Sequence, residues 1–139
     1  MSDAAWVHRW LVRAQDDLDT AKHLYSNYHP KKLEIICYLC QQTTEKALKA
    51  YMTQNDFAFP FTHDCRKLCL LCAEQENSFR EFVDDCVDLT PYATQARYPD
   101  DDEITEEETA SALRKAERIV SFCAKLIGPA PSSDTPADS

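Results

Sequence analysis

Apolar residues recur every third or fourth position along much of the chain, the spacing of one face of an α-helix. The first stripe predicts a helix from about Asp3 to Tyr28, which His29-Pro30 ends because the residue before a proline avoids helical geometry. The positions opposite this stripe are mostly charged, as in a helix with one solvated face. The stripe comprises Val7, Trp10, Leu11, Ala14, Leu18, Ala21, Leu24, Tyr25 and Tyr28.

A second stripe predicts a helix from Pro30 to about Gln54, with the proline in the first turn, where its missing N–H costs nothing. Because the connection between the two long helices is tight, we expect an antiparallel hairpin. The apolar positions of the second helix are Leu33, Ile36, Cys37, Cys40, Thr44, Ala47, Leu48 and Tyr51.

A loop is expected at residues 55–61, with Phe57, Phe59 and Phe61 as apolar anchors. Further helices follow this loop, each preceded by a residue that can cap it. Thr62 or Asp64 precedes the third helix, Ser78 precedes the fourth, and Thr105 with Glu108 forms a capping box before the last. A brief helical turn restarts at Thr90-Pro91. The three helices are expected at Cys65–Glu76, Phe79–Leu89 and from the capping box to about Ile127. The apolar stripe of the last helix comprises Ala110, Leu113, Ala116, Ile119, Val120, Cys123 and Leu126.

These elements predict an all-α fold, an up-and-down antiparallel helical bundle of four to five main helices plus a short helix. The chain has 139 residues, the size of one domain, and its single glycine argues against a sheet protein with many tight turns. We expect the helical domain at residues 1–128, where Gly128 ends the last helix. Residues 129–139 have little to bury and are expected to form a disordered tail.

The net charge of −9 disfavours broad binding of nucleic acid, although a local basic site could hold a nucleotide or an RNA. The chain has no signal-peptide pattern and no apolar run long enough for a membrane. Seven cysteines, an odd number, suit free thiols in a reducing compartment. We therefore expect a cytoplasmic protein without membrane contact.

Several cysteines and one histidine have spacings that resemble those of zinc ligands. The cysteines fall on the apolar stripes, however, and the chain lacks the glycines of zinc knuckles, so the pattern favours core thiols. We expect no metal and no cofactor. The residues considered are Cys37, Cys40, His63, Cys65, Cys69 and Cys72.

The polar edge of the second helix is the first candidate site. One interpretation is a solvated face on which Glu45 and Lys49 pair at a spacing of four. The other is an edge that packs on a partner chain or borders a polar cleft. The edge consists of Gln41, Gln42, Glu45, Lys46 and Lys49.

Arg97 is the second candidate, since Tyr98 and the rigid Pro99 follow it and hold it at a fixed angle. An arginine there could clamp a phosphate or form a salt bridge with the nearby acidic loop or Glu45. His63 lies at a helix start, where capping or loop packing is favoured over catalysis. The chain has no glycine-rich phosphate loop and no strained nucleophile motif.

The order of several motifs resembles the HEPN domain family (higher eukaryotes and prokaryotes nucleotide-binding domain), of the bacterial type that contains Arg-Tyr-Pro, over about residues 6–127. The resemblance implies a helical bundle that is usually dimeric. The motifs are Trp10 with Ala14, Asp17-Leu18 and Ala21; Gln41-Gln42-x-x-Glu45-Lys46-x-x-Lys49-Ala50; Thr62-His63-Asp64; Arg97-Tyr98-Pro99-Asp100; and Thr105 to Glu108 with Ala116.

The resemblance also implies a range of activities. Many family members are metal-independent ribonucleases that use an arginine followed a few residues later by a histidine. Others accompany small nucleotidyltransferases in toxin–antitoxin pairs, and some bind nucleotides. Arg97 matches the family arginine, but residues 98–103 contain no histidine.

This departure leads to the hypothesis of a non-catalytic, homodimeric module that binds a nucleotide, an RNA end or a partner protein. One alternative is a divergent metal-independent ribonuclease that uses Arg97 and His63. Another is a structural docking subunit for a nucleotidyltransferase, with the second helix as the docking surface. The residues expected to bind the ligand are Gln42, Glu45, Lys46, Lys49, Arg97 and Tyr98.

Overall fold

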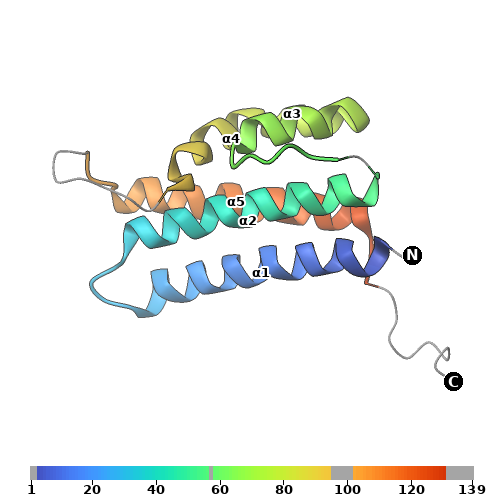
Figure 1. Ribbon diagram of the computed structural model, residues 1–139. Helices are drawn as coiled ribbons and strands as arrows, with labels where there is room; N and C mark the ends of the chain where they lie inside the picture. Colours follow the sequence, from blue (N-terminus) through green and yellow to red (C-terminus); the bar gives the residue numbers. More distant parts are fainter. Residues whose placement is uncertain (1–2, 57, 95–101, 131–139) are drawn as a thin grey trace, which may run out of the picture.

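The computed structural model describes residues 3–56, 58–94 and 102–130. Every regular element in these residues is helical, which confirms the predicted all-α bundle (Figure 1). The α-helices are α1 (Asp3–Asn27), α2 (Leu33–Gln54), α3 (Cys65–Gln75), α4 (Val83–Leu89) and α5 (Glu106–Ile127), and the 3-10 helices are η1 (Asn77–Phe82) and η2 (Thr90–Ala93).

Helix α2 is the centre of the bundle. It packs antiparallel to α1, which confirms the predicted hairpin, and it also contacts α5 and α3 (Figure 1). With 22 residues it is about 33 Å long. Because neighbours lie on several sides, most of the helix is buried, including polar positions that a surface helix would expose. The docking of a partner on α2 stays a prediction, and the side chains left for it include the exposed Ile35 and the half-buried Tyr38, Leu39, Gln42 and Lys46.

The predicted start of α2 is also wrong, because the helix begins at Leu33 and not at Pro30. The five residues from Tyr28 to Lys32 connect the two long helices. A chain that reverses between helices packed 8–10 Å apart needs such a connection, so the proline belongs to the turn. Helix α1 ends at Asn27, one residue before the predicted end.

Side-chain caps fix the starts of the shorter helices. Of the two proposed caps of α3, Asp64 is the one that accepts from the backbone N–H of Lys67, at 3.1 Å. Ser78 was the expected cap of the next helix, and this is wrong. The carboxylate of Glu76 accepts from both the backbone N–H and the hydroxyl of Ser78, and the helix begins as the 3-10 segment η1.

The two ends of α5 agree with the prediction. The hydroxyl of Thr105 accepts from the backbone N–H of Glu108 at 3.0 Å, and Gly128 ends the helix with a φ of 85°, a conformation that favours glycine. The buried face is turned slightly from the predicted stripe: Thr109 and Ala112 are buried, whereas Ala110 and Leu113 are half-buried.

All seven cysteines lie in the described residues, are buried and form no disulfide. Their predicted use as core residues is confirmed. Burial raises the pKa of Cys40, Cys65 and Cys72 well above the ordinary value, so these thiols are protonated at neutral pH. Phe79, in contact with the rings of Tyr51 and Phe122, fills the core between η1, α2 and α5. Among the described helices, none is both long and apolar enough to cross a membrane.

Candidate functional site

A buried carboxylate, that of Glu45 in the middle of α2, is the centre of a polar network. Lys49 Nζ donates to one carboxylate oxygen at 2.8 Å, and Gln41 Nε2 donates to the other at 3.1 Å. The three residues are one helical turn apart, so they share a face of α2. We call Gln41, Glu45, Lys49 and His63 the Glu45 network.

Gln41 joins the network to the connection between α2 and α3. Its side chain is fully buried, and Nε2 also donates to the backbone carbonyl of His63 at 2.9 Å. Its amide oxygen accepts from Gln42 Nε2 at 2.8 Å. The connection runs beside α2 beneath α3 (Figure 1). The amide of Gln41 thus fixes the backbone that carries His63.

His63 forms the exposed edge of the network. Its Nδ1 lies 3.1 Å and 3.2 Å from the two oxygens of Glu45. An ionised carboxylate only accepts hydrogen bonds, so Nδ1 carries the proton in these contacts. Nε2 is the ring nitrogen that does not contact Glu45. The His63 side chain is 66% exposed, against 7% for that of Glu45. An exposed imidazole is thereby held in place by a buried anion.

Lys49 lies between aromatic rings. Its Nζ is 5.7 Å from the ring centroid of Trp10 and 5.3 Å from that of Phe59, and the two rings meet edge to face at 6.0 Å. Ring faces attract a cation, and the Glu45 carboxylate neutralises it. The buried charges of the network are therefore paired rather than isolated.

Glu45 is ionised at neutral pH despite its burial. Burial by itself raises the pKa of this carboxyl group, but hydrogen bonds from Lys49, Gln41 and His63 outweigh it and hold the pKa below its ordinary value of 4.5. The network therefore presents a permanent negative charge to the His63 ring. A carboxylate in this position orients an imidazole by accepting its Nδ1–H.

Lys46 points to the other side of α2 and joins it to α1. Its Nζ lies 2.6 Å from a carboxylate oxygen of Asp17, and both side chains are partly exposed. Four of the six residues predicted to bind a ligand, namely Gln42, Glu45, Lys46 and Lys49, thus lie together on α2, each in contact with a protein partner. Their role in ligand binding stays a prediction.

The other two, Arg97 and Tyr98, lie outside the described residues, as do Pro99 and Asp100. What the sequence interpretation missed is the pairing of His63 with Glu45 and the two rings around Lys49. Trp10 was placed in the core by its position on the first stripe, and Phe59 was expected only to anchor a loop. No spacing rule joins these residues, since they come from three separate segments.

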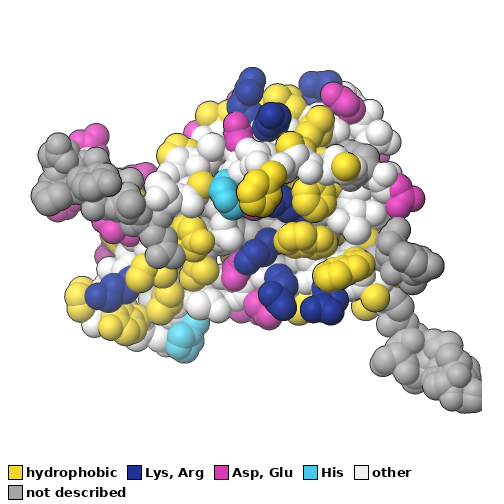
Figure 2. All heavy atoms as spheres, in the orientation of Figure 1, with side chains coloured by type: hydrophobic (Ala, Val, Ile, Leu, Met, Phe, Trp, Pro, Cys, Tyr) yellow, Lys and Arg dark blue, Asp and Glu magenta, His cyan; other side chains and the backbone are white. Residues whose placement is uncertain are grey.

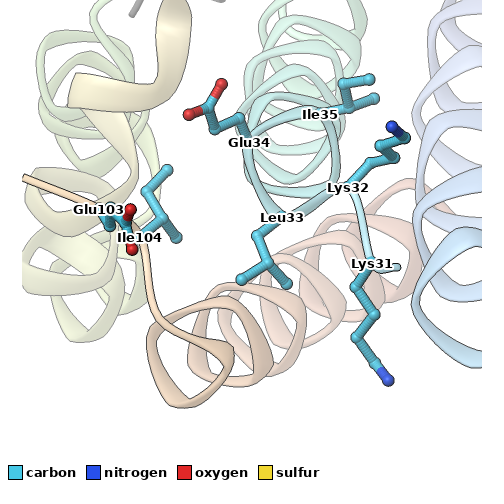
Figure 3. Close-up of a pocket in the computed structure, with 7 residues that line it drawn as sticks. All are labelled: Lys31, Lys32, Leu33, Glu34, Ile35, Glu103 and Ile104. Atoms are coloured by element: carbon cyan, nitrogen blue, oxygen red, sulfur yellow. The ribbon is translucent and has the colours of Figure 1, made fainter. Parts of the chain in front are cut away.

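Apart from the Glu45 network, a hollow of about 320 Å³ lies at the start of α2, near the residues before α5 (Figure 3). Leu33 is about 18 Å along the helix from Glu45, so this hollow is separate from the network. Its two lysines extend away from Glu103 and Ile104, and they lie over the rings of Tyr25 in α1 and Tyr28 just after it. Its charges are mixed in sign and form no comparable network. The lining residues are Lys31, Lys32, Leu33, Glu34, Ile35, Glu103 and Ile104.

Comparison with known proteins identifies related chains. A family model described as "HEPN domain" matches residues 7–126. Among solved structures, the crystal structure of an archaeal HEPN homologue superposes with a TM-score of 0.68 at 22% identity, covering 88% of this chain and 98% of that one. A search of the curated proteins gives no match. The structural likeness, at this identity, concerns the fold alone.

Proposed function

The chain belongs to the HEPN domain family, and on that premise we propose that it binds a nucleotide or an RNA end without cleaving it. The observation that carries the proposal is the exposed His63 ring held on buried Glu45. A ring already fixed in position loses little side-chain entropy when it contacts a phosphate. Lys46, at the partly exposed side of α2, is paired with Asp17 and adds an ammonium donor on the same helix.

The role of each residue in the Glu45 network follows from its burial. Glu45, Gln41 and Lys49 are buried and satisfy one another, so they act as the support. His63 is the member that can reach a ligand. Arg97 is added to the proposed ligand-binding residues because of its sequence motif. Gln42 and Tyr98 stay proposed ligand contacts, Tyr98 from its sequence motif alone.

A thermal-shift and calorimetric titration tests the proposal with ADP, ATP and a short RNA that carries a 5′-phosphate. We expect binding by the wild type and roughly tenfold or greater weakening in His63→Ala, as for loss of a hydrogen bond to a charged group. His23→Ala is the matched control, because His23 is an exposed histidine on α1 that contacts only a local asparagine among the described residues.

Two results would contradict this proposal. One is the absence of a response to every nucleotide and RNA, together with full cellular function of Arg97→Ala. The other is an equal loss of affinity in His63→Ala and His23→Ala, which would show that His63 contributes no more to binding than an unrelated exposed histidine.

The assembly is also part of the proposal. We propose a cytoplasmic homodimer that accompanies a nucleotidyltransferase in a toxin–antitoxin-like pair, as other members of the family do. Co-purification from the native host tests the partnership, and light scattering coupled to size exclusion tests the dimer. A monomer that retrieves no nucleotidyltransferase would contradict both.

A metal-independent ribonuclease is the second candidate, and the His63–Glu45 pair is the observation that favours it. A carboxylate that orients an imidazole is the usual arrangement of a general base. His63 Nε2 would take the proton of a ribose 2′-OH, whose oxygen attacks phosphorus to form a 2′,3′-cyclic phosphate, while the bond from phosphorus to the 5′-oxygen breaks and that oxygen takes a proton from water. This candidate predicts cleavage in the presence of a chelator that is lost in His63→Ala and in Arg97→Ala. Cleavage that survives both substitutions would eliminate it.

A further inference from the structure

We infer that one face of α1, together with the connection that follows α2, stacks the unpaired bases of a single-stranded nucleic acid. This inference rests on the proposed function and names the class of ligand. The surface is defined by four aromatic residues and two arginines, which we call the aromatic platform: Trp6, Arg9, Trp10, Arg13, Phe59 and Phe61.

The α1 half of the platform is a hollow between rings and cations. Trp6, Arg9, Trp10 and Arg13 are three and four residues apart, so they share one face of the helix, and they line a hollow of about 130 Å³. The guanidinium of Arg9 lies 4.9 Å from the ring centroid of Trp6, which is 56% exposed. The exposed ring is a large apolar surface, so covering it with a stacked base would be favourable.

The second half of the platform comes from the connection. Phe59 meets Trp10 edge to face, and both rings flank the Lys49 ammonium. Phe61, two residues later, is fully exposed, and His63 follows after another two. The platform is therefore continuous with the exposed edge of the Glu45 network, through contacts that join α1, α2 and the connection.

The charge of this surface is opposite to that of the whole chain. The net charge is −9, yet Figure 2 shows Lys and Arg side chains gathered beside hydrophobic ones over α1 and α2. Lys46 and Lys49 are paired with Asp17 and Glu45, whereas Arg9 and Arg13 are exposed and form no ion pair with any described side chain. Two unpaired guanidinium groups are thus available to phosphates.

Rings interleaved with cations are the chemistry by which proteins hold unpaired strands. Every base has a face that stacks on an aromatic ring, and the phosphates between bases contact arginine or lysine. The bases of a duplex are already stacked on each other and cannot use such rings. An interface between two copies of the chain would also use tryptophan, phenylalanine and arginine, but an isologous interface would bring the unpaired arginines of both copies into one patch. The combination on this face therefore favours a single strand.

Intrinsic fluorescence provides a direct test, because the only two tryptophans of the chain, Trp6 and Trp10, both belong to the platform. The wild type is titrated with an unpaired RNA of about ten nucleotides, a usual site size. We expect quenching that saturates, and affinity roughly 5- to 150-fold lower in Trp6→Ala and in Phe61→Ala. The same strand annealed to its complement should bind much more weakly.

Tyr28→Ala is the matched control, since Tyr28 is an exposed ring beside a lysine, just after the other end of α1. Its affinity should equal that of the wild type. Salt gives a second readout. Arg9→Gln should reduce the slope of log affinity against log salt by about 0.7, the value for one phosphate of a single strand, while Arg80→Gln on η1 should leave it unchanged.

The outcomes separate this inference from the proposed function. Nucleotide binding that needs His63, without quenching and without an effect of Trp6→Ala or Phe61→Ala, overturns the platform and leaves the proposed function standing. Equal affinity for the duplex also overturns the inference. So does a dimer that Trp6→Ala dissociates in a protein that binds no RNA, because the face is then an interface between copies. Failure of every nucleotide and strand to bind overturns both proposals.

Discussion

At the scale of single residues, the pairing of Glu45 with Lys49 holds two charges inside a helical bundle. Both side chains are buried, and each satisfies the other at 2.8 Å. Desolvating two ions is costly, and good geometry with further hydrogen bonds offsets that cost. Gln41 and His63 provide those bonds, so the pair is stable only as part of the whole network.

Removing one partner should therefore be much more damaging than removing both. We expect Glu45→Ala to lower the free energy of unfolding by about 3–5 kcal/mol, because it leaves the Lys49 ammonium buried without its anion. The double variant Glu45→Gln with Lys49→Met should recover most of this loss. Urea denaturation measures both, with exposed Glu74→Ala on α3 as the control, expected within about 0.5 kcal/mol of the wild type. Equal losses in the single and double variants would contradict the argument.

Acidification should act through the same carboxylate. The folded pKa of Glu45 lies below the ordinary value of 4.5, so the folded state holds this proton less tightly than the unfolded chain. The resulting stability is fully present above about pH 4.5 and is lost as the pH falls through the folded pKa. We expect Glu45→Gln to flatten the decline in stability between neutral and acidic pH. Parallel curves for the wild type and this variant would show that Glu45 does not contribute.

At the scale of elements, a side-chain cap decides where α5 begins. The Thr105 hydroxyl accepts the backbone N–H of Glu108 and so satisfies a donor that α5 cannot satisfy internally. Three glutamates in the first turn add favourable charge at the same helix end. The start of α5 is thus specified by a few adjacent residues.

Thr105→Ala should lower the free energy of unfolding by about 1 kcal/mol, the usual cost of losing a cap. Thr105→Ser keeps the hydroxyl and should stay close to the wild type. Denaturation of the two variants side by side separates the hydrogen bond from the packing of the methyl group. If serine is as damaging as alanine, the hydrogen bond is not the reason for the stability.

Local signals explain which elements the sequence predicts well. The periodic stripes predict α1, α2 and α5, and the Thr105–Glu108 capping box predicts where α5 begins, because each signal lies within one segment. The same reasoning interprets the polar edge of α2 as either a solvated surface or a cleft. The polarity of a residue does not reveal which other elements pack against it. Only packing against α1, α3 and the connection buries Gln41 and Glu45. The His63–Glu45 contact joins separate elements, so no pattern along one helix contains it.

At the scale of the whole molecule, the core is rich in thiols that water does not reach. All seven cysteines are buried, and burial raises the pKa of most of them. Cys69 differs, because a hydrogen bond with the Cys86 thiol lowers its pKa, yet its side chain is also fully buried. Reactivity requires both a thiolate and access, and the fold withholds at least one of these from each residue.

A thiol reagent should therefore distinguish the folded from the unfolded protein. We expect little reaction of the native protein over minutes and seven equivalents in denaturant, measured by absorbance of the released chromophore. The rate in the native state should rise with destabilising variants such as Glu45→Ala. Rapid reaction of even one cysteine in the native protein would contradict the burial described above.

The attachment of the connection to α2 has a consequence for how the molecule opens. Residues 58–64 are held by the amide of Gln41, the carboxylate of Glu45 and the ring of Phe59, rather than by helical hydrogen bonds of their own. Such a segment can detach at a smaller free-energy cost than global unfolding requires. In hydrogen-exchange terms, its amide protons should be replaced by deuterium well before those in the middle of α2. The site thus joins a slowly exchanging half, which carries the anion, to a quickly exchanging half, which carries the imidazole.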